Sequence, residues 1–291
     1  MTKIPWTDES WNPVIGCTKI AGGCKNCYAE KMAKRFWKQW GLLTPPHHFG
    51  VKWFPERLDI PLHWRKPRKV FVCSMSDLFH PGVPVEFQMR VFNVMGRAKH
   101  HVFQILTKRP ERMNIFVTEL YKTFEKFPKD YRPQIPYPNI WLGTSISTQA
   151  DADKNIPILL QIPAAVRFLS IEPMLEPICL SNISCMRADS EAGWEGSHGG
   201  YPYLNCLTGR EYTVLVGNDT NYKIDQVIIG CESGPKARLC SIEVIRDAVR
   251  QCKDAGVACF VKQIPLNGKC SKNPSEWPED LRIQEYPTIN R

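Results

Sequence analysis

Residues 69–109 read KVFVCSMSDLFHPGVPVEFQMRVFNVMGRAKHHVFQILTKR. Two short apolar runs, 69–73 and 101–106, bracket a stretch of helix length at 85–98. Runs that are rich in β-branched and aromatic residues and apolar on both faces are typical of buried parallel strands. This part of the chain therefore predicts a strand, a helix and a second strand, which together make one βαβ unit.

The same alternation continues towards the C-terminus. Further strand-like runs lie at 139–142, 166–171, 226–229 and 257–261. Stretches of helix length lie between or before them, at 110–127, 150–161 and 241–255. Repeated strand–helix alternation favours an α/β fold with a parallel sheet, either a barrel or an open doubly wound sheet.

Two regions interrupt this rhythm. Residues 37–69 are rich in Trp, Pro and His, and we expect an irregular excursion there. Residues 181–222 carry Gly193, Gly196, Gly199 and Gly200 and are too long for an ordinary connection, so we expect an insertion that is a candidate lid over the functional site. With 43% hydrophobic residues, the 291 residues can form one domain, 1–291, around a large core.

Composition limits the class of protein. No apolar run is long enough to span a membrane, and the first residues lack the pattern of a signal peptide, so we expect a soluble, cytoplasmic protein with no membrane partner. In that compartment the twelve cysteines are expected to be thiols or metal ligands rather than disulfides. The formal net charge of +9 favours an anionic partner such as nucleic acid or a phosphorylated molecule.

The strongest chemical signal is the segment 16–28, GCTKIAGGCKNCY, which places Cys17, Cys24 and Cys27 on a glycine-containing loop. Three thiolates can hold a [4Fe–4S] cluster and leave one iron open for the amino and carboxylate groups of S-adenosylmethionine (SAM). A structural zinc site needs four ligands, and no neighbouring residue supplies an obvious fourth. A zinc site with a remote fourth ligand, or three unrelated thiols, remain the alternatives.

Six motifs carry a resemblance to a known family. They stand at 11–35 (WNPVIGCTKIAGGCKNCYAEKMAKR), 105–113 (ILTKRPERM), 141–147 (WLGTSIS), 168–175 (FLSIEPML), 228–238 (IIGCESGPKAR) and 260–263 (FVKQ). In this order they resemble the three-cysteine phage and prophage proteins of the radical-SAM superfamily. One departure from the wider superfamily is the six-residue gap between Cys17 and Cys24, where a gap of three is usual.

The resemblance implies a partial (β/α) TIM-like barrel of the radical-SAM type, with the cluster on the loop after the first strand and SAM across the carboxyl ends of the strands. Some members are associated with hypermodified thymidines in phage DNA. The expected reaction is therefore hydrogen abstraction from substrate and isomerisation of an amino-acid substituent on a modified thymidine. A virus-encoded protein of this kind would act in the host cytoplasm.

In a barrel of this type, functional side chains stand directly after the strands. The expected cofactor-binding residues are Tyr28, Ser74, Ser76, Asp77, Thr107, Ser145, Glu172 and Lys262. The expected catalytic residues are Lys108, Cys231 and Glu232, with Cys231 as a candidate hydrogen-atom donor. Helix capping by Asp77 and the hydroxyls, a solvated Lys108 and a merely apolar role for Cys231 are the structural alternatives.

The expected partners are DNA or a modified nucleotide and an electron donor such as flavodoxin or ferredoxin. Aromatic and basic residues interleave near the N-terminus, a pattern that can stack bases and bind phosphates but that core packing also explains. Alternative functions are a radical-SAM lyase or methyltransferase on DNA or tRNA, such as a photoproduct-repair enzyme. A zinc-stabilised nucleic-acid-binding protein without catalysis is the alternative from a different class.

Overall fold

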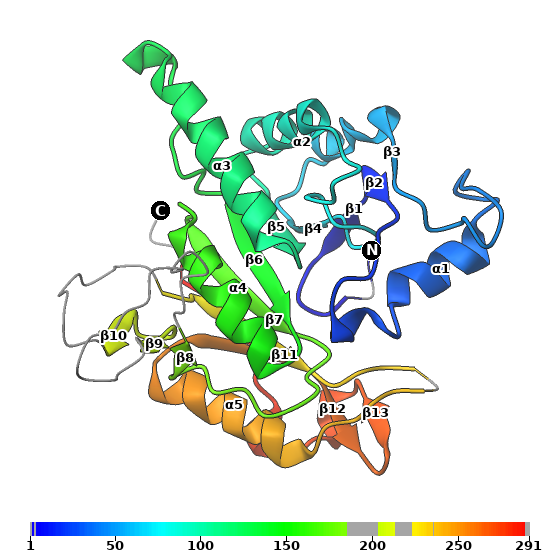
Figure 1. Cartoon of the computed structure of the whole chain (residues 1–291), viewed down its shortest axis with the longest axis vertical. Helices are drawn as coiled ribbons and strands as arrows, with labels where there is room; N and C mark the ends of the chain where they lie inside the picture. Colours follow the sequence, from blue (N-terminus) through cyan, green and yellow to red (C-terminus); the bar gives the residue numbers. More distant parts are fainter. Residues whose placement is uncertain (1, 3, 185–202, 213–222, 235, 289–291) are drawn as a thin grey trace, which may run out of the picture.

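An eight-stranded sheet that curls into a half barrel forms the centre of the fold (Figure 1). The computed structural model describes residues 2, 4–184, 203–212, 223–234 and 236–288. Neighbouring strands are parallel, except for the last pair, which is antiparallel. In sheet order the strands are β1 (Glu9–Trp11), β4 (Lys69–Val72), β5 (Val102–Thr107), β6 (Ile140–Ile146), β7 (Val166–Ile171), β11 (Gln226–Gly230), β12 (Ala258–Leu266) and β13 (Lys269–Ser271).

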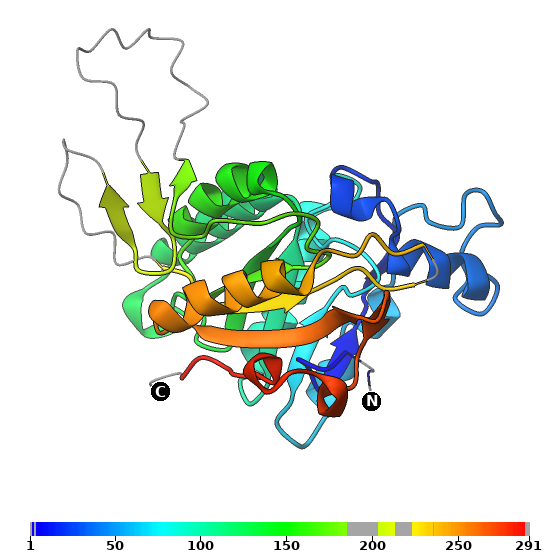
Figure 2. The ribbon, with the colours of Figure 1, turned by 90° about the horizontal axis from the view of Figure 1, so that it is seen from below.

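Four helices connect the parallel strands and lie along the outside of the curled sheet (Figure 2). They are α2 (Val85–Arg97) after β4, α3 (Pro110–Glu125) after β5, α4 (Gln149–Gln161) after β6 and α5 (Ile242–Asp254) after β11. Each buries one apolar face; in α2 this face includes Phe87, Val91 and Met95. Burying such side chains stabilises the fold by about 1.5–3 kcal/mol each. The predicted α/β fold with a parallel sheet is confirmed, and each of the six predicted strands is found.

The concave face of the sheet changes character along the strands because successive side chains alternate between faces. Near the amino ends this face carries a buried apolar plug made by Trp6, Trp141, Val166, Phe168, Ile228 and Phe260. Further along the same strands, at even spacing from the plug, the inward positions become polar. Phe168 is followed by Ser170 and Glu172, and Phe260 is followed by Lys262. Apolar side chains therefore fill the inside of the half barrel at the amino ends of the strands, and polar side chains face inward at the carboxyl ends.

Smaller elements fill the two regions that interrupt the alternation. In residues 37–69, β3 (Lys52–Trp53) pairs with β2 (Val14–Ile15), and two 3₁₀ turns, Pro55–Arg57 and Ile60–His63, follow. Within 181–222, β8 (Ile183–Ser184), β9 (Tyr203–Asn205) and β10 (Arg210–Tyr212) form a separate antiparallel sheet. The predicted lid falls largely on 185–202 and 213–222, which lie outside the described residues. Among the residues that the structure describes, no helix has the length and apolar character of a membrane span.

Candidate functional site

A cavity of about 1000 Å³ opens at the carboxyl ends of the parallel strands. Its wall combines strand-end residues with the segment 16–27, here called the cysteine loop, and with the start of α1 (Tyr28–Phe36). The structure brings every predicted site residue to this one wall: Cys17, Cys24, Cys27, Tyr28, Ser74, Ser76, Asp77, Thr107, Lys108, Ser145, Glu172, Cys231, Glu232 and Lys262. The predicted site residues therefore lie together in one cavity wall, while the roles predicted for them remain predictions.

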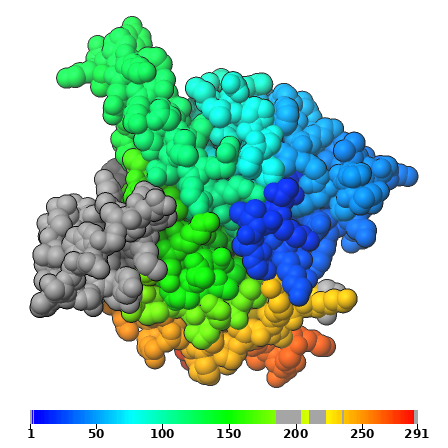
Figure 3. Space-filling model, viewed as in Figure 1, coloured from blue at the N-terminus to red at the C-terminus, as the bar shows by residue number. Residues whose placement is uncertain are grey.

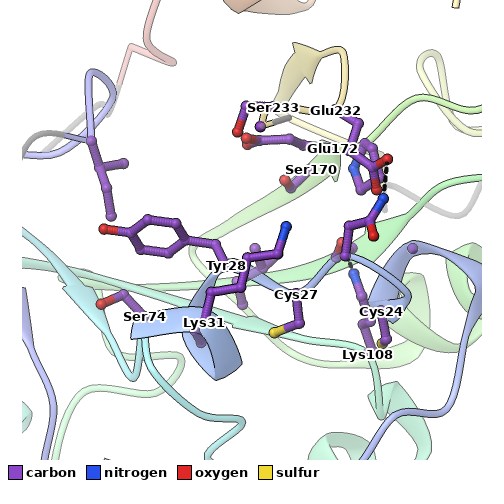
Figure 4. A pocket seen from close by; sticks show the side chains of 18 of the residues that line it. Cys24, Cys27, Tyr28, Lys31, Ser74, Lys108, Ser170, Glu172, Glu232 and Ser233 are labelled. Atoms are coloured by element: carbon purple, nitrogen blue, oxygen red, sulfur yellow. Dashed lines mark hydrogen bonds between the residues drawn. The ribbon is translucent and has the colours of Figure 1, made fainter. Parts of the chain in front are cut away.

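The cysteine loop begins at a tight backbone contact. Gly16 has a φ of +97°, and its N–H donates to the carbonyl of Met75 at 3.1 Å. Cys17 then donates its N–H to the carbonyl of Phe49, also at 3.1 Å. A 3₁₀ turn, Gly22–Cys24, follows, and α1 starts directly after Cys27. All three cysteines line the cavity, and Figure 4 labels Cys24 and Cys27 there.

The cysteine loop presents three thiols to the cavity. All three thiols are free of disulfides and partly exposed. In the described part of the chain no three His, Cys, Asp or Glu side chains are close enough together to hold a metal ion. A single zinc ion needs all its ligands around one point, whereas in a four-iron cluster each cysteine binds a different iron atom. Cys17, Cys24 and Cys27 are donors of the type that an iron–sulfur cluster uses.

Arg109 anchors the first cysteine to the end of β5. Its guanidinium donates to the Sγ of Cys17 at 3.5 Å and to the backbone carbonyl and hydroxyl of Thr18 at 3.1 and 3.0 Å. The same group forms a buried ion pair with Asp77 at 2.9 Å. Burial raises the pKa of the Cys17 thiol, Asp77 adds to the rise, and the Arg109 charge opposes both. Arg109 therefore both positions Cys17 and favours its thiolate form.

The carboxylate of Asp77 is engaged in holding Arg109 and the end of β5. Besides the ion pair with Arg109, its carboxylate accepts hydrogen bonds from the Thr107 hydroxyl at 2.7 Å, from the Phe79 N–H at 3.0 Å and from the Lys108 N–H at 3.2 Å. Four bonds fill the lone pairs of a carboxylate. Asp77 thus lines the cavity and holds Arg109 and the end of β5, and its predicted part in cofactor binding remains a prediction.

A second anchor holds the other end of the cysteine loop. Glu232 accepts hydrogen bonds from the side chain of Asn26 at 2.8 Å and from the backbone N–H and guanidinium of Arg238. Arg238 also donates to the carbonyl of Gly22 at 3.0 Å. Burial alone would raise the pKa of Glu232, but the bonds from Arg238 and Asn26 lower it to about 2. In Figure 3 the N-terminal segment in blue accordingly lies against the yellow segment that carries this anchor.

We expect replacement of Glu232 by glutamine to destabilise the fold mainly above pH 4.5. The folded pKa of about 2 lies below the ordinary value of 4.5, so the ionised carboxylate adds stability that is present above pH 4.5 and is lost as pH falls towards 2. Urea titrations at about pH 7 and about pH 3.5 should therefore show a smaller loss for E232Q at the lower pH. Glu125, exposed at the end of α3, supplies the control variant E125Q. Equal losses of unfolding free energy for E232Q at both pH values would contradict the stabilising role of the ionised Glu232 carboxylate.

Two further polar pairs cross the cavity wall. The ammonium group of Lys108 donates to the Ser145 hydroxyl, and Lys262 forms an ion pair with Glu172. Gln263 adds a weaker bond to Glu172 at 3.4 Å. The hydroxyl of Ser76 donates to the carbonyl of Gly16 at 2.7 Å and so helps to hold the start of the cysteine loop.

Sequence reasoning did not include Arg238 among the expected site residues, and it considered Arg109 only as an alternative to Lys108 for binding a carboxylate or phosphate. Both stand inside the quoted motifs ILTKRPERM and IIGCESGPKAR, so the motifs contained the signal. Their importance comes from their partners, Asp77 and Glu232, and these pairings depend on the folded positions of the loops.

Comparison with known proteins gives one family. A family model described as "Protein of unknown function (DUF5131)" matches residues 1–275. No curated protein and no solved structure matches the chain.

Proposed function

We propose that this chain, which belongs to the DUF5131 family of proteins of unknown function, is a radical-SAM enzyme with a partial β/α barrel of that type. The supporting observation is that three free, partly exposed cysteines share one cavity with every predicted strand-end residue. Cys17, Cys24 and Cys27 would hold a [4Fe–4S] cluster, which supplies the electron that cleaves SAM into methionine and a 5′-deoxyadenosyl radical. The resemblance of the six motifs to the phage three-cysteine proteins supports the same proposal.

The chain's own residues would bind and orient the ligands. Lys108 donates one N–H to Ser145 and keeps two for the carboxylate of SAM. Glu172, held by Lys262, can accept from ribose hydroxyls. The apolar plug below these groups closes the cavity floor and keeps water away from a reactive radical, while the wall holds the substrate C–H in reach.

Charge in the cavity favours an anionic substrate. The lining carboxylates Asp77, Glu172 and Glu232 each pair with a cation. The cationic residues of the wall outnumber them: Lys31, Lys108, Arg109, Lys262, Lys269 and Lys272. Tyr28 also lines the cavity, with 64% of its surface exposed, and its ring can stack on a base. We therefore propose a modified pyrimidine in DNA, or the corresponding nucleotide, as substrate, with isomerisation of an amino-acid substituent as the reaction.

Two lysines, one at the start of β13 and one directly after it, provide a test of the nucleic-acid partner. Lys269 and Lys272 are exposed and line the cavity, so they can reach phosphates of a bound strand. Replacing both with alanine should weaken binding of a single-stranded oligonucleotide and reduce the slope of log K against log salt by about 1.4. Fluorescence anisotropy over a salt series measures both quantities. The double variant K122A/K126A, at the end of α3 and away from the cavity wall, is the control, and an unchanged slope in K269A/K272A would contradict the proposal.

Anaerobic purification tests the cofactor directly. We expect a brown protein that contains iron and sulfide, whose visible absorbance is bleached by dithionite, and that forms 5′-deoxyadenosine from SAM. A natural donor such as flavodoxin or ferredoxin would replace dithionite in the cytoplasm. A colourless protein that holds one zinc ion would overturn the proposal in favour of a non-catalytic nucleic-acid-binding protein. Nucleosides from phage DNA digested with and without the active enzyme would then separate isomerase from lyase or methyltransferase activity.

A further inference from the structure

The first helix and the turn after it carry an unbalanced positive charge. Residues 28–38 contain a single carboxylate, Glu30, and four cations: Lys31, Lys34, Arg35 and Lys38. Glu30 is paired with Lys19 at 2.8 Å. Among the residues that the structure describes, none of the four cations forms an ion pair with a carboxylate. These four side chains, here called the basic face of α1, therefore keep their charge for a partner.

The basic face points to solvent. Its members follow Lys31 at a spacing of three, four and seven residues, which places them on one side of a helix. The opposite side of α1 is packed, because Ala29 and Ala33 are buried in a small core with Ile15. All four cationic residues are exposed. In Figures 1 and 2, α1 also lies apart from the four helices that cover the sheet, so the basic face is open to a partner.

Two other helices show how exposed cations are balanced in this fold. On α3 and α5, cations pair with carboxylates three residues away, as Lys122 does with Glu119 at 2.9 Å. Such pairs stabilise a helix, whereas like charges four residues apart, such as Lys31 and Arg35, destabilise it. The helix dipole favours Lys34 and Arg35 in the last turn, but it does not favour Lys31 near the amino end. Helix stability therefore does not account for the whole basic face, and attraction of an anionic partner does.

The basic face is continuous with the cavity wall. Tyr28 and Lys31, at the start of α1, both line the cavity, and Figure 4 labels them there. The other three cations do not line the cavity and continue the face away from it. From Lys31 to Lys38 a helix rises about 10 Å, which spans about two to three phosphates of one strand. A strand whose base enters the cavity can therefore lay its neighbouring phosphates along α1.

Aromatic rings accompany the outer cations. The guanidinium of Arg35 lies 5.2 Å from the centre of the Phe36 ring, and the ammonium of Lys38 lies 5.3 Å from the centre of the Trp37 ring. Both rings belong to partly exposed residues. Surfaces that bind single-stranded nucleic acid combine cations for the phosphates with aromatic rings on which bases stack. This composition favours a single strand of nucleic acid over an acidic protein as the partner.

We propose that the basic face of α1 binds the phosphates of a single nucleic-acid strand and leads that strand into the cavity. Lys34, Arg35 and Lys38 hold phosphates outside the cavity, and Lys31 and Tyr28 receive the strand at its wall. The substrate is then a base within a polynucleotide, because a free nucleotide would make no use of cations outside the cavity. This inference rests on the nucleic-acid substrate proposed above but not on the cluster, because phosphate binding needs no cofactor.

The test measures binding of a short, fluorescein-labelled single-stranded DNA oligonucleotide to the full chain by anisotropy over a salt series. Each phosphate contact contributes about 0.7 to the slope of log K against log salt, so K34A/R35A/K38A should lower the slope by about 2. The unchanged chain should also bind the oligonucleotide more tightly than a dinucleotide, and this advantage should shrink in the triple variant. Alanine is a strong helix former, so α1 should stay folded, which circular dichroism verifies.

Two further variants separate charge from structure. K34R/R35K/K38R keeps the three positive charges and should bind the oligonucleotide with the slope of the unchanged chain. K122A/K126A/K129A removes three exposed cations at the end of α3 and in the turn after it, and its slope should not change either.

An unchanged slope in K34A/R35A/K38A, or an equal loss in the α3 control, would overturn the role of the basic face. Displacement of the oligonucleotide by poly-L-glutamate as effectively as by unlabelled DNA of equal charge would assign the face to an acidic protein instead. The proposed substrate fails differently: the unchanged chain would then show no salt-dependent binding of the oligonucleotide at all. Iron content and SAM cleavage are not read in this experiment, so failure of the proposed cluster is also distinguishable.

Discussion

Replacing Cys24 with alanine is expected to reduce bound iron to background and to abolish formation of 5′-deoxyadenosine. With Cys24 removed, only Cys17 and Cys27 remain as thiol ligands on the cysteine loop, and two thiolates cannot hold a cubane that needs three. Because Cys24 is partly exposed and lies in a short 3₁₀ turn, its loss should cost little fold stability. The measurements are iron and sulfide content after anaerobic reconstitution, and 5′-deoxyadenosine by chromatography.

The control is C179A, which removes an exposed thiol that does not line the cavity. C179A should bind iron and cleave SAM as the unchanged chain does, while thermal unfolding should be similar for both variants. SAM cleavage retained by C24A would refute the cluster assignment. Iron lost equally from C179A would show that reconstitution loads cysteines without selectivity.

The strands that sequence could predict are those buried on both faces. The runs in β5, β6 and β7 consist mostly of apolar and β-branched residues because helices cover one face and the plug or the cavity covers the other. β1 and β13 carry no such signal. Their sequences, Glu9–Trp11 (ESW) and Lys269–Ser271 (KCS), are three residues long and mostly polar, and each lies at an edge of the sheet with one neighbour.

Sequence could predict which residues line the candidate site, but not which of their side chains are already paired with other residues. Polar residues after parallel strands meet at one edge whatever the details of the fold, so Ser145, Glu172 and Lys262 could be expected to share a cavity. Whether a carboxylate is free depends on partners that are distant in sequence. Asp77 is taken by Arg109, which is 32 residues away.

The cysteine loop depends on one glycine, and Gly16→Ala is expected to be the most damaging single substitution near it. The φ of +97° is a conformation that alanine adopts only with strain, which costs about 1–2 kcal/mol by itself. A Cβ at this position would also lie 2.2 Å from the carbonyl oxygen of Gly50 and 2.8 Å from that of Phe49. Both contacts are with backbone, so no side-chain rotation relieves them, and we expect a total loss of ~3 kcal/mol or more in the free energy of unfolding.

The Gly256→Ala variant separates the strain of a positive φ from the clash of the added Cβ with backbone atoms. Gly256 also has a positive φ, +63°, but a Cβ there would meet nothing within 4 Å, so this variant should lose only the backbone term of about 1 kcal/mol. Urea titrations of G16A and G256A measure the loss of unfolding free energy in each variant. Equal losses would show that the contact with the Gly50 carbonyl adds no destabilisation. Because Gly16 directly precedes Cys17 and bonds to Met75, relief of the clash must move the first cysteine. G16A should therefore also bind less iron than G256A after reconstitution, which ties the backbone geometry of this turn to the chemistry proposed for the loop.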